Sequence, residues 1–302
     1  MNGVLIIDKP AGLTSHDVVN RVRRLIGQRS VGHLGTLDPL ATGVLPLVIG
    51  NLTRLAQFYR ATEKSYEGVI RFGFATDTYD ADGDPLGPAQ RVEVSLEQVQ
   101  GLAEKFRGVI EQMPPPFSAK KIHGVPAYKF ARRKKDVVLQ PVRVEIKLFE
   151  ILSCAGDRAT FRANVAAGTY LRTVAHDLGR ELGCGAHLAC LRRTQVAEFE
   201  LSEAITLERL ASAAAADNLE EVFVHPRRLL PHMPSVTAGD EAAALIRLGR
   251  AVNLPEMSRA RQVKVFYGQR ELIAIATRVA GTLFHPEIVL AAAQPTPTAN
   301  TR

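Results

Sequence analysis

The chain has 302 residues, enough for one large domain or two smaller ones, and 46% of them are hydrophobic, as in ordinary globular proteins. Lysine and arginine outnumber the acidic residues 38 to 31, and the net charge of +7 favours a polyanionic partner. No apolar run approaches the ~20 residues of a membrane span, and the N-terminus lacks a secretory signal, so we expect a cytoplasmic protein without membrane contact. Cys154, Cys184 and Cys190 fit neither a disulfide framework nor a paired zinc site, and we expect reduced packing residues.

The first elements follow from hydrophobic patterns and capping signals. The opening GVLIIDKP predicts a buried strand that ends at Pro10, and Ser15 is expected to cap a helix over residues 16–26 that ends at Gly27. The apolar run 44–49 predicts a buried strand or helix.

The middle of the chain alternates between strand and helix patterns. Alternation predicts a strand over residues 66–74, and Ser95 is expected to cap a helix that continues to Ile110, before the three prolines 114–116.

Residues 142–148 and 160–165 are then predicted to form a hairpin-like strand pair, and 171–182 to form a helix. This places Tyr170 and Arg172 at a strand-to-helix junction, where active-site residues often lie.

Prolines 226, 231 and 234 suggest a linker, so we divide the chain into residues 1–230, a second domain over 235–292 and a disordered tail, 293–302. The second domain is predicted to contain a helix over 240–250 and strands over 262–268, 271–279 and 285–290.

The stretch VGHLGTLDPLATGVLPLVIG holds a single acid, Asp38, in an apolar run with several glycines. Because a residue before proline is pushed toward extended backbone, Asp38 and Pro39 predict a held loop that presents the carboxylate. Spacing alone favours an ordinary Asx-type turn over a catalytic acid.

The residue types in this stretch favour catalysis. They closely resemble the G-H-x-G-x-L-D-P-x-A-x-G-V-L motif of the TruB family of tRNA pseudouridine synthases. The matching residues are Gly32, His33, Gly35, Leu37, Asp38, Pro39, Ala41, Gly43, Val44 and Leu45. The resemblance implies that Asp38 is the catalytic residue and attacks the target nucleoside.

Three further motifs supply an expected base pocket. Arg172, in GTYLRT, resembles the family's G-T-Y-I-R-T, whose arginine pairs with the catalytic aspartate. Tyr66 matches the K-x-Y motif, whose tyrosine stacks on the flipped base, and Tyr170 and Leu191 would form the remaining apolar walls. Read alone, each tyrosine is more simply a core aromatic with a hydrogen-bonded hydroxyl.

Other residues are candidates for RNA contact. His33 could be a loop histidine, a base near neutral pH or a wedge that stacks on RNA bases, and the resemblance favours the wedge. Arg54 would contact phosphate, with a solvated arginine as the alternative. Lys64 of the K-x-Y motif is also expected to bind RNA.

A basic insertion, about residues 114–140, interleaves cations with Tyr128 and Phe130. Its cations are Lys120, Lys121, Lys129, Arg132, Arg133, Lys134 and Lys135. A solvated charge run is the alternative, but the resemblance to the family's P-P-x-x-S-A-x-K motif favours RNA. The chain departs from the family at residues 133–135, where a glycine is common.

Two segments are expected to support the site. The acids Asp80, Asp82 and Asp84 suggest a calcium loop, but the glycine is misplaced and Arg91 stands where the closing acid belongs. The segment instead resembles the family's T-D-T-x-D-x-x-G turn. Residues 9–15 resemble its N-terminal K-P-x-G region, and we assign them structural support.

Together these resemblances imply a tRNA pseudouridine synthase without cofactor or metal that acts on the T-arm uridine at tRNA position 55. We expect the protein to be a monomer. The implied fold is α+β, with a mixed-sheet pseudouridine synthase core, flanking helices and a small C-terminal PUA-like β-barrel, although Ala274 occupies a usual glycine position. The alternatives are a guide-dependent ribosomal RNA pseudouridylase and an RNA-binding or chaperone protein without turnover. A metal-dependent hydrolase is remote, because the sequence has no ligand cluster.

Overall fold

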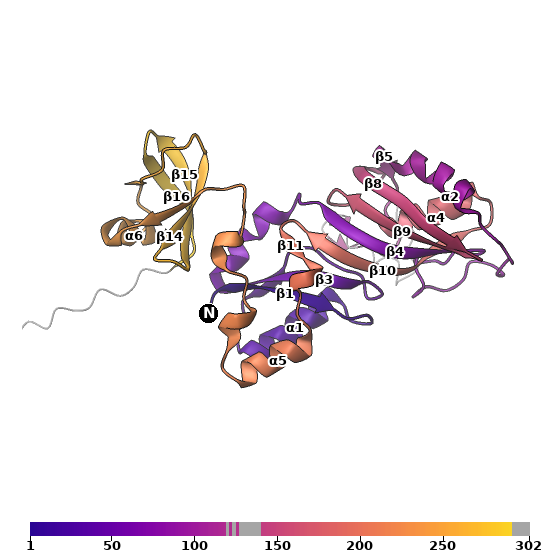
Figure 1. Cartoon of the computed structure of the whole chain (residues 1–302), viewed down its shortest axis with the longest axis horizontal. Helices are drawn as coiled ribbons and strands as arrows, with labels where there is room; N and C mark the ends of the chain where they lie inside the picture. Colours follow the sequence, from indigo (N-terminus) through magenta and orange to yellow (C-terminus); the bar gives the residue numbers. More distant parts are fainter. Residues whose placement is uncertain (119–120, 123–124, 127–139, 292–302) are drawn as a thin grey trace, which may run out of the picture.

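The computed structural model describes residues 1–118, 121–122, 125–126 and 140–291. Its largest unit is a nine-stranded mixed sheet with helices, and a five-stranded sheet forms a curled half-barrel near the C-terminus (Figure 1). The predicted α+β fold class is confirmed. Within this described part, no helix is long and apolar enough to cross a membrane.

The N-terminal elements are β1 (Gly3–Lys9), α1 (Ser15–Ile26), β2 (Val31–His33), β3 (Thr42–Ile49) and the 3-10 helix η1 (Gly50–Tyr59). The predicted cap of α1 is wrong by one residue: Thr14 accepts the hydrogen bond from the Asp17 amide at 3.0 Å. Ser15 is buried and turns toward the loop before β3 instead. Gly27 ends the helix in the left-handed conformation, as predicted.

The next elements are β4 (Lys64–Phe72), α2 (Leu96–Ala103), the 3-10 helix η2 (Glu104–Phe106) and β5 (Gly108–Gln112). Ser95 caps α2, but the predicted continuation of this helix to Ile110 is wrong. Gly108 has a φ of +82°, and the β-branched residues after it pair with the neighbouring strand. Strand β4 also begins earlier than predicted and ends before Gly73, whose φ is +103°.

The second half of the core contains β8 (Val142–Ala155), β9 (Arg158–Val165), α4 (Leu171–Glu181), β10 (Ala186–Val196) and β11 (Phe199–Glu200), after a short β6 (Lys121–Ile122) and β7 (Val125–Pro126). The hairpin and the helix were predicted, whereas β10 was not. Cys190 lies on β10 and is exposed, so the expectation of a packing residue is wrong there; a register shift between Leu188 and Cys190 turns it outward.

Strand β10 joins the two halves of the large sheet, whose main order is β1-β3-β10-β4-β9-β8-β5. Strand β2 also pairs with β3, and β11 with β10, which makes nine strands. It runs parallel to β3 and antiparallel to β4, with Arg193 opposite Gly43 on one side and Tyr66 on the other. A Cβ on Gly43 would collide with the backbone of Arg193. This close approach brings the loop before β3, the start of β4 and the end of β10 to one place.

The chain continues through the 3-10 helix η3 (Leu201–Glu203), α5 (Leu207–Ala215), η4 (Leu219–Val222) and η5 (Pro226–Arg228) into the C-terminal domain. That domain contains β12 (Ser235–Ala238), α6 (Asp240–Arg247), β13 (Val252–Asn253), β14 (Gln262–Tyr267), β15 (Glu271–Ala280) and β16 (Leu283–Val289). Its sheet order is β12-β14-β15-β16-β13. Strands β12 and β13 were not predicted.

The C-terminal sheet lies beside the β1–β3 half of the core (Figure 1). Phe266 and Ile288 share a buried cluster with Leu52 of η1. Two polar contacts add to this packing: Asn51 donates to the carbonyl of Leu290 at 2.7 Å, and a hydrogen bond of 2.6 Å joins Arg54 to Val289.

Candidate active site

The Asp38 loop is fixed by side chains from the N-terminal segment. The Ser15 hydroxyl accepts from the Leu37 amide at 2.8 Å and donates to the Leu37 carbonyl at 3.0 Å. Lys9 Nζ donates to the carbonyl of Pro39 at 3.2 Å, and the Gly12 amide donates to the same oxygen at 2.9 Å. The structural support expected of residues 9–15 is confirmed, because these bonds hold the backbone on both sides of Asp38.

Arg193 holds the same loop from the sheet. Its side chain is fully buried and donates to the carbonyls of Val44 at 2.7 Å, Gly35 at 3.0 Å and Thr36 at 3.3 Å. Sequence reasoning missed this residue. The only signal was the Arg-Arg pair after Leu191, and it does not say which arginine points inward.

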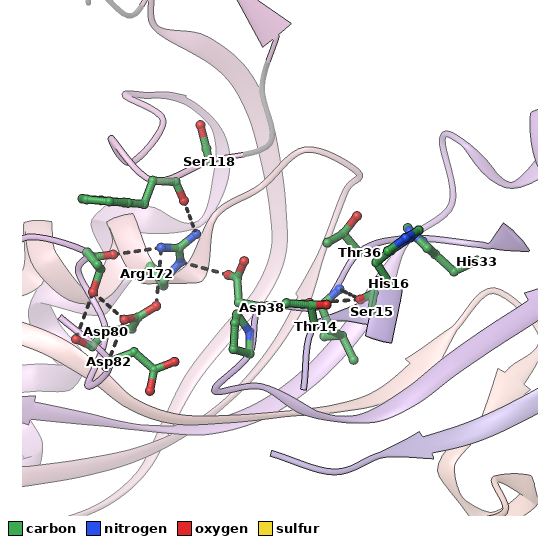
Figure 2. A pocket seen from close by; sticks show the side chains of 14 residues that line it. Thr14, Ser15, His16, His33, Thr36, Asp38, Asp80, Asp82, Ser118 and Arg172 are labelled. Carbon is green, nitrogen blue, oxygen red and sulfur yellow. Dashed lines mark hydrogen bonds and ion pairs between the residues drawn. The ribbon is translucent and has the colours of Figure 1, made fainter. Parts of the chain in front are cut away.

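The predicted partners Asp38 and Arg172 lie together. Nε of Arg172 is 2.9 Å from Oδ2 of Asp38. The guanidinium also donates to the carbonyls of Thr78 at 2.9 Å and Phe117 at 3.0 Å, and it lies 3.4 Å from Oδ2 of Asp80 (Figure 2). Because the Arg172 side chain is only 6% exposed, these contacts fix its position.

Asp80 is a second acid at this arginine, which sequence reasoning had assigned only to a supporting turn. Its carboxylate accepts from the Thr78 hydroxyl at 2.5 Å and from the Asp82 amide at 3.2 Å. The Thr76 hydroxyl donates to the Asp80 carbonyl at 2.7 Å. These bonds within the turn hold the Asp80 carboxylate in position toward Arg172. The predicted supporting role of the turn is confirmed.

The surroundings of Asp38 shift its acidity. Its side chain is 42% exposed, and this exposure is to the cavities that it lines. Burial raises the pKa of the Asp38 carboxyl; Arg172 opposes this rise and Asp80 adds to it. We expected Arg172 to keep the acid ionised. Its attraction does lower the pKa, but burial outweighs it.

All five residues predicted for catalysis and base binding line one cavity of about 300 Å³. They are Asp38, Tyr66, Tyr170, Arg172 and Leu191. This volume is at the small end of the ~300 to 1,000 Å³ typical of ligand pockets, and it suits one nucleoside rather than a duplex.

Gln112 positions Tyr170 at this cavity. Its side-chain carbonyl accepts from the Tyr170 amide at 2.8 Å, and its amide donates to the Tyr170 carbonyl at 3.0 Å. Gln112 is buried at the end of β5. Sequence reasoning missed it, because it placed this segment after a helix instead of on a strand.

A second cavity of about 690 Å³ borders the other side of Asp38 (Figure 2). His33 and His16 lie at its far side from Arg172 (Figure 2). Burial and the nearby Arg193 lower the pKa of His33, so its ring is neutral near pH 7. A neutral, partly buried ring is compatible with the predicted stacking role and unsuited to binding phosphate by charge.

The other predicted RNA contacts are spread more widely. Arg54 contacts the C-terminal domain, which the sequence did not indicate, and Lys64 lines the smaller cavity. For Lys121 only the backbone is described. The positions of Lys120, Lys129, Arg132, Arg133, Lys134 and Lys135 fall outside the described residues. Over the part of the chain that is described, no group of three or more His, Cys, Asp or Glu side chains could hold a metal ion.

Comparisons with known proteins agree with this arrangement. The model of the TruB family pseudouridylate synthase N-terminal domain matches residues 23–171, and that of the tRNA pseudouridylate synthase B C-terminal domain matches 172–233. The chain is 48% identical to tRNA pseudouridine synthase B of Solibacter usitatus over 293 residues, which cover 96% of this chain and 100% of that protein. The Aquifex aeolicus protein of the same name is 38% identical, with 94% and 98% covered.

Among solved structures, a Cbf5-Nop10-Gar1 complex contains a chain with a TM-score of 0.69 and 27% identity, covering 96% of this chain and 85% of that one. The fold and the site define the class as the pseudouridine synthases, which are isomerases. Within that class, the chain belongs to the TruB family.

Proposed function

We propose that this chain isomerises uridine to pseudouridine at position 55 in the T arm of tRNA. Its relatives named tRNA pseudouridine synthase B support this substrate. The observation that carries the proposal is the Asp38–Arg172 pair, 2.9 Å apart, at a cavity of nucleoside size.

Base flipping supplies the substrate to this cavity. A stacked uridine cannot reach Asp38 until its nucleotide turns out of the RNA, and His33 fills the space that the base leaves. The flipped base stacks on Tyr66, a contact worth ~1 to 3 kcal/mol, and Tyr170 and Leu191 close the pocket.

The reaction exchanges one bond to the ribose for another. Asp38 acts on C1′ of the ribose or on C6 of uracil, and the N1–C1′ bond breaks. The base turns and C5 bonds to C1′, after which C5 loses its proton and N1 gains one. Arg172 holds the carboxylate in place and stabilises its charged form.

The rest of the chain binds RNA in this proposal. The basic insertion, residues 114–140, grips the T arm through phosphates together with Arg54, and a PUA-like domain over residues 235–292 contacts RNA elsewhere. The chain acts as a cytoplasmic monomer without a cofactor.

The test is release of tritium from C5-labelled uridine in tRNA. Asp38→Asn is expected to abolish release while tRNA binding survives, since the amide keeps the shape of the side chain but cannot act as a nucleophile. Turnover by the lone wild-type chain on an isolated T-arm hairpin separates this function from a guide-dependent pseudouridylase. Binding without any product in the wild type would favour an RNA chaperone and contradict the proposal.

A further inference from the structure

Lys64 is a cation at the active cavity, and no acid among the described residues pairs with it. It lies at the start of β4, two residues before Tyr66 and on the same side of the strand. Its ammonium donates to the carbonyl of Thr62 at 2.9 Å. Within the described residues it pairs with no carboxylate, although its side chain is partly buried.

A second cation without an acidic partner among the described residues, Arg193, lies directly beside it. A Cβ placed on Gly35 would be 3.2 Å from Cε of Lys64 and 3.6 Å from Nη1 of Arg193, so both side chains pass the same glycine. The bonds of Arg193 go to backbone carbonyls, with no acid among the described residues. Arg60, also without a described acidic partner, lines the cavity beside Lys64.

The neighbouring positive charges of Lys64 and Arg193 repel each other unless an anion binds between or beside them. Burial, and then the charge of Arg193, lower the pKa of Lys64 to about 8. Asp38 lines the same cavity but is paired with Arg172. Like charges that are partly removed from water repel strongly, because the surrounding dielectric is low. The cations therefore mark a place for an anion that the described residues do not provide.

We propose that Lys64, assisted by Arg60, binds a phosphodiester group that flanks the flipped uridine, with Arg193 supplying fixed positive charge behind it. The inference rests on the proposed function and specifies which part of the substrate this corner holds. With the base between Tyr66 and Tyr170 and the ribose at Asp38, a flanking phosphate reaches the edge of the cavity. Binding there fixes the nucleotide after it has left the stack.

Phosphate binding requires a protonated lysine, and a pKa of about 8 leaves most of Lys64 charged at pH 7. Above that pKa, free Lys64 loses its proton and its attraction for phosphate. The charged and titratable groups at the cavity are Asp38, Arg60, Tyr66, Tyr170, Arg172 and Arg193. Since arginine stays charged, Lys64→Arg is expected to bind phosphate at pH 9 as at pH 7.

The experiment uses T-arm hairpins in which one phosphate beside the target uridine is replaced by a neutral methylphosphonate. For the wild type, one such replacement, on the 5′ or the 3′ side, is expected to raise KM about 10-fold. Lys64→Met should raise KM by a similar factor on the unmodified hairpin, with kcat within about two-fold, and the methylphosphonate should then add no further loss.

Lys105→Met is the matched control. Lys105 lies on η2, is exposed and pairs with Glu181 at 2.7 Å. Its KM should respond to the methylphosphonate as in the wild type. Lys64→Arg keeps the test valid if Lys64→Met folds poorly: its KM should stay flat from pH 7 to 9, where that of the wild type rises.

Two outcomes would overturn the inference. One is independent, multiplicative effects of Lys64→Met and the methylphosphonate; the other is a loss in kcat without a change in KM, which would indicate proton transfer by Lys64. Failure of the wild type to convert the unmodified hairpin would instead contradict the proposed function.

Discussion

The proposed catalytic cavity and the C-terminal domain are held by different kinds of contact. Around Asp38, polar side chains from distant parts of the sequence bind the loop backbone, as Ser15 does at Leu37 and Arg193 at Gly35. The C-terminal domain packs on the core through buried apolar side chains such as Phe266, with two polar bonds at the edge.

This difference separates two effects of mutation. A directional polar contact fixes the position of an atom, and its loss moves the reacting groups, which lowers kcat. Apolar packing positions a whole domain. Since we propose that this domain contacts RNA, we expect a loss of packing there to alter RNA binding and hence KM. Substitutions in the two regions should therefore differ in kind as well as in size.

The largest effect is expected for Arg193→Met. The substitution removes the Arg193 donor from the buried carbonyl of Val44, at a cost of ~1 to 3 kcal/mol, and from the less buried carbonyls of Gly35 and Thr36, and it frees the loop that carries Asp38. We expect a drop in kcat of more than about 100-fold and a clear fall in the free energy of unfolding. Urea denaturation and single-turnover kinetics measure both.

Its neighbour Arg192 is the matched control, since that side chain is 40% exposed and pairs with Asp8 on the outside of the sheet. Arg192→Met should cost at most ~1 kcal/mol of stability. Equal losses for the two variants would contradict the proposed tethering of the loop.

A substitution at Arg172 should alter the pH profile. In the proposed reaction Asp38 acts as the carboxylate. Burial raises the pKa of this group, and Arg172 opposes that rise. Removing the charge in Arg172→Met raises the pKa of Asp38 further, so the acidic limb of kcat moves to higher pH. Arg172→Lys keeps a positive charge and should move this limb less. An unchanged limb in Arg172→Met would show that another group controls it.

Ser15 and Thr14 provide a smaller, paired test. Ser15→Ala removes two hydrogen bonds to Leu37, and we expect kcat to fall about 10-fold. Thr14→Ala removes the cap of α1 and should cost ~1 kcal/mol of stability while kcat stays near that of the wild type. Thermal unfolding and kcat, measured for both variants, distinguish loop positioning from helix stability.

The smallest effect is expected at the domain contact. Asn51→Ala removes the bond to the Leu290 carbonyl, but the apolar packing around Phe266 remains. We expect KM for tRNA to rise only about two-fold to three-fold, with kcat unchanged. A fall in kcat would show that the domain contact also positions the cavity.

The sequence could predict the acid and its partner because short motifs name them. It could not predict the packing between motifs. Arg193 lies inward and Arg192 outward because of the way β10 pairs with β3 and β4. The two adjacent arginines interrupt the hydrophobic alternation of β10, so its pattern did not predict a strand. Gln112 was missed for a related reason: the helical segment ends at Phe106, and Gly108, with a positive φ, starts a strand.

The cap of α1 illustrates a limit at shorter range. Thr14 and Ser15 are both good capping residues, and sequence alone does not say which hydroxyl bonds the helix. The choice depends on Leu37, which lies far along the chain and takes the Ser15 hydroxyl. Tertiary contacts of this kind decide between locally equivalent options.

The central claim is that Asp38 converts one uridine in the T arm. Mass mapping of pseudouridine in tRNA incubated with the purified chain tests it most directly. We expect a single new pseudouridine at position 55 with the wild type and none with Asp38→Asn at equal tRNA binding. Product formed by Asp38→Asn, or pseudouridine at another position, would contradict the account.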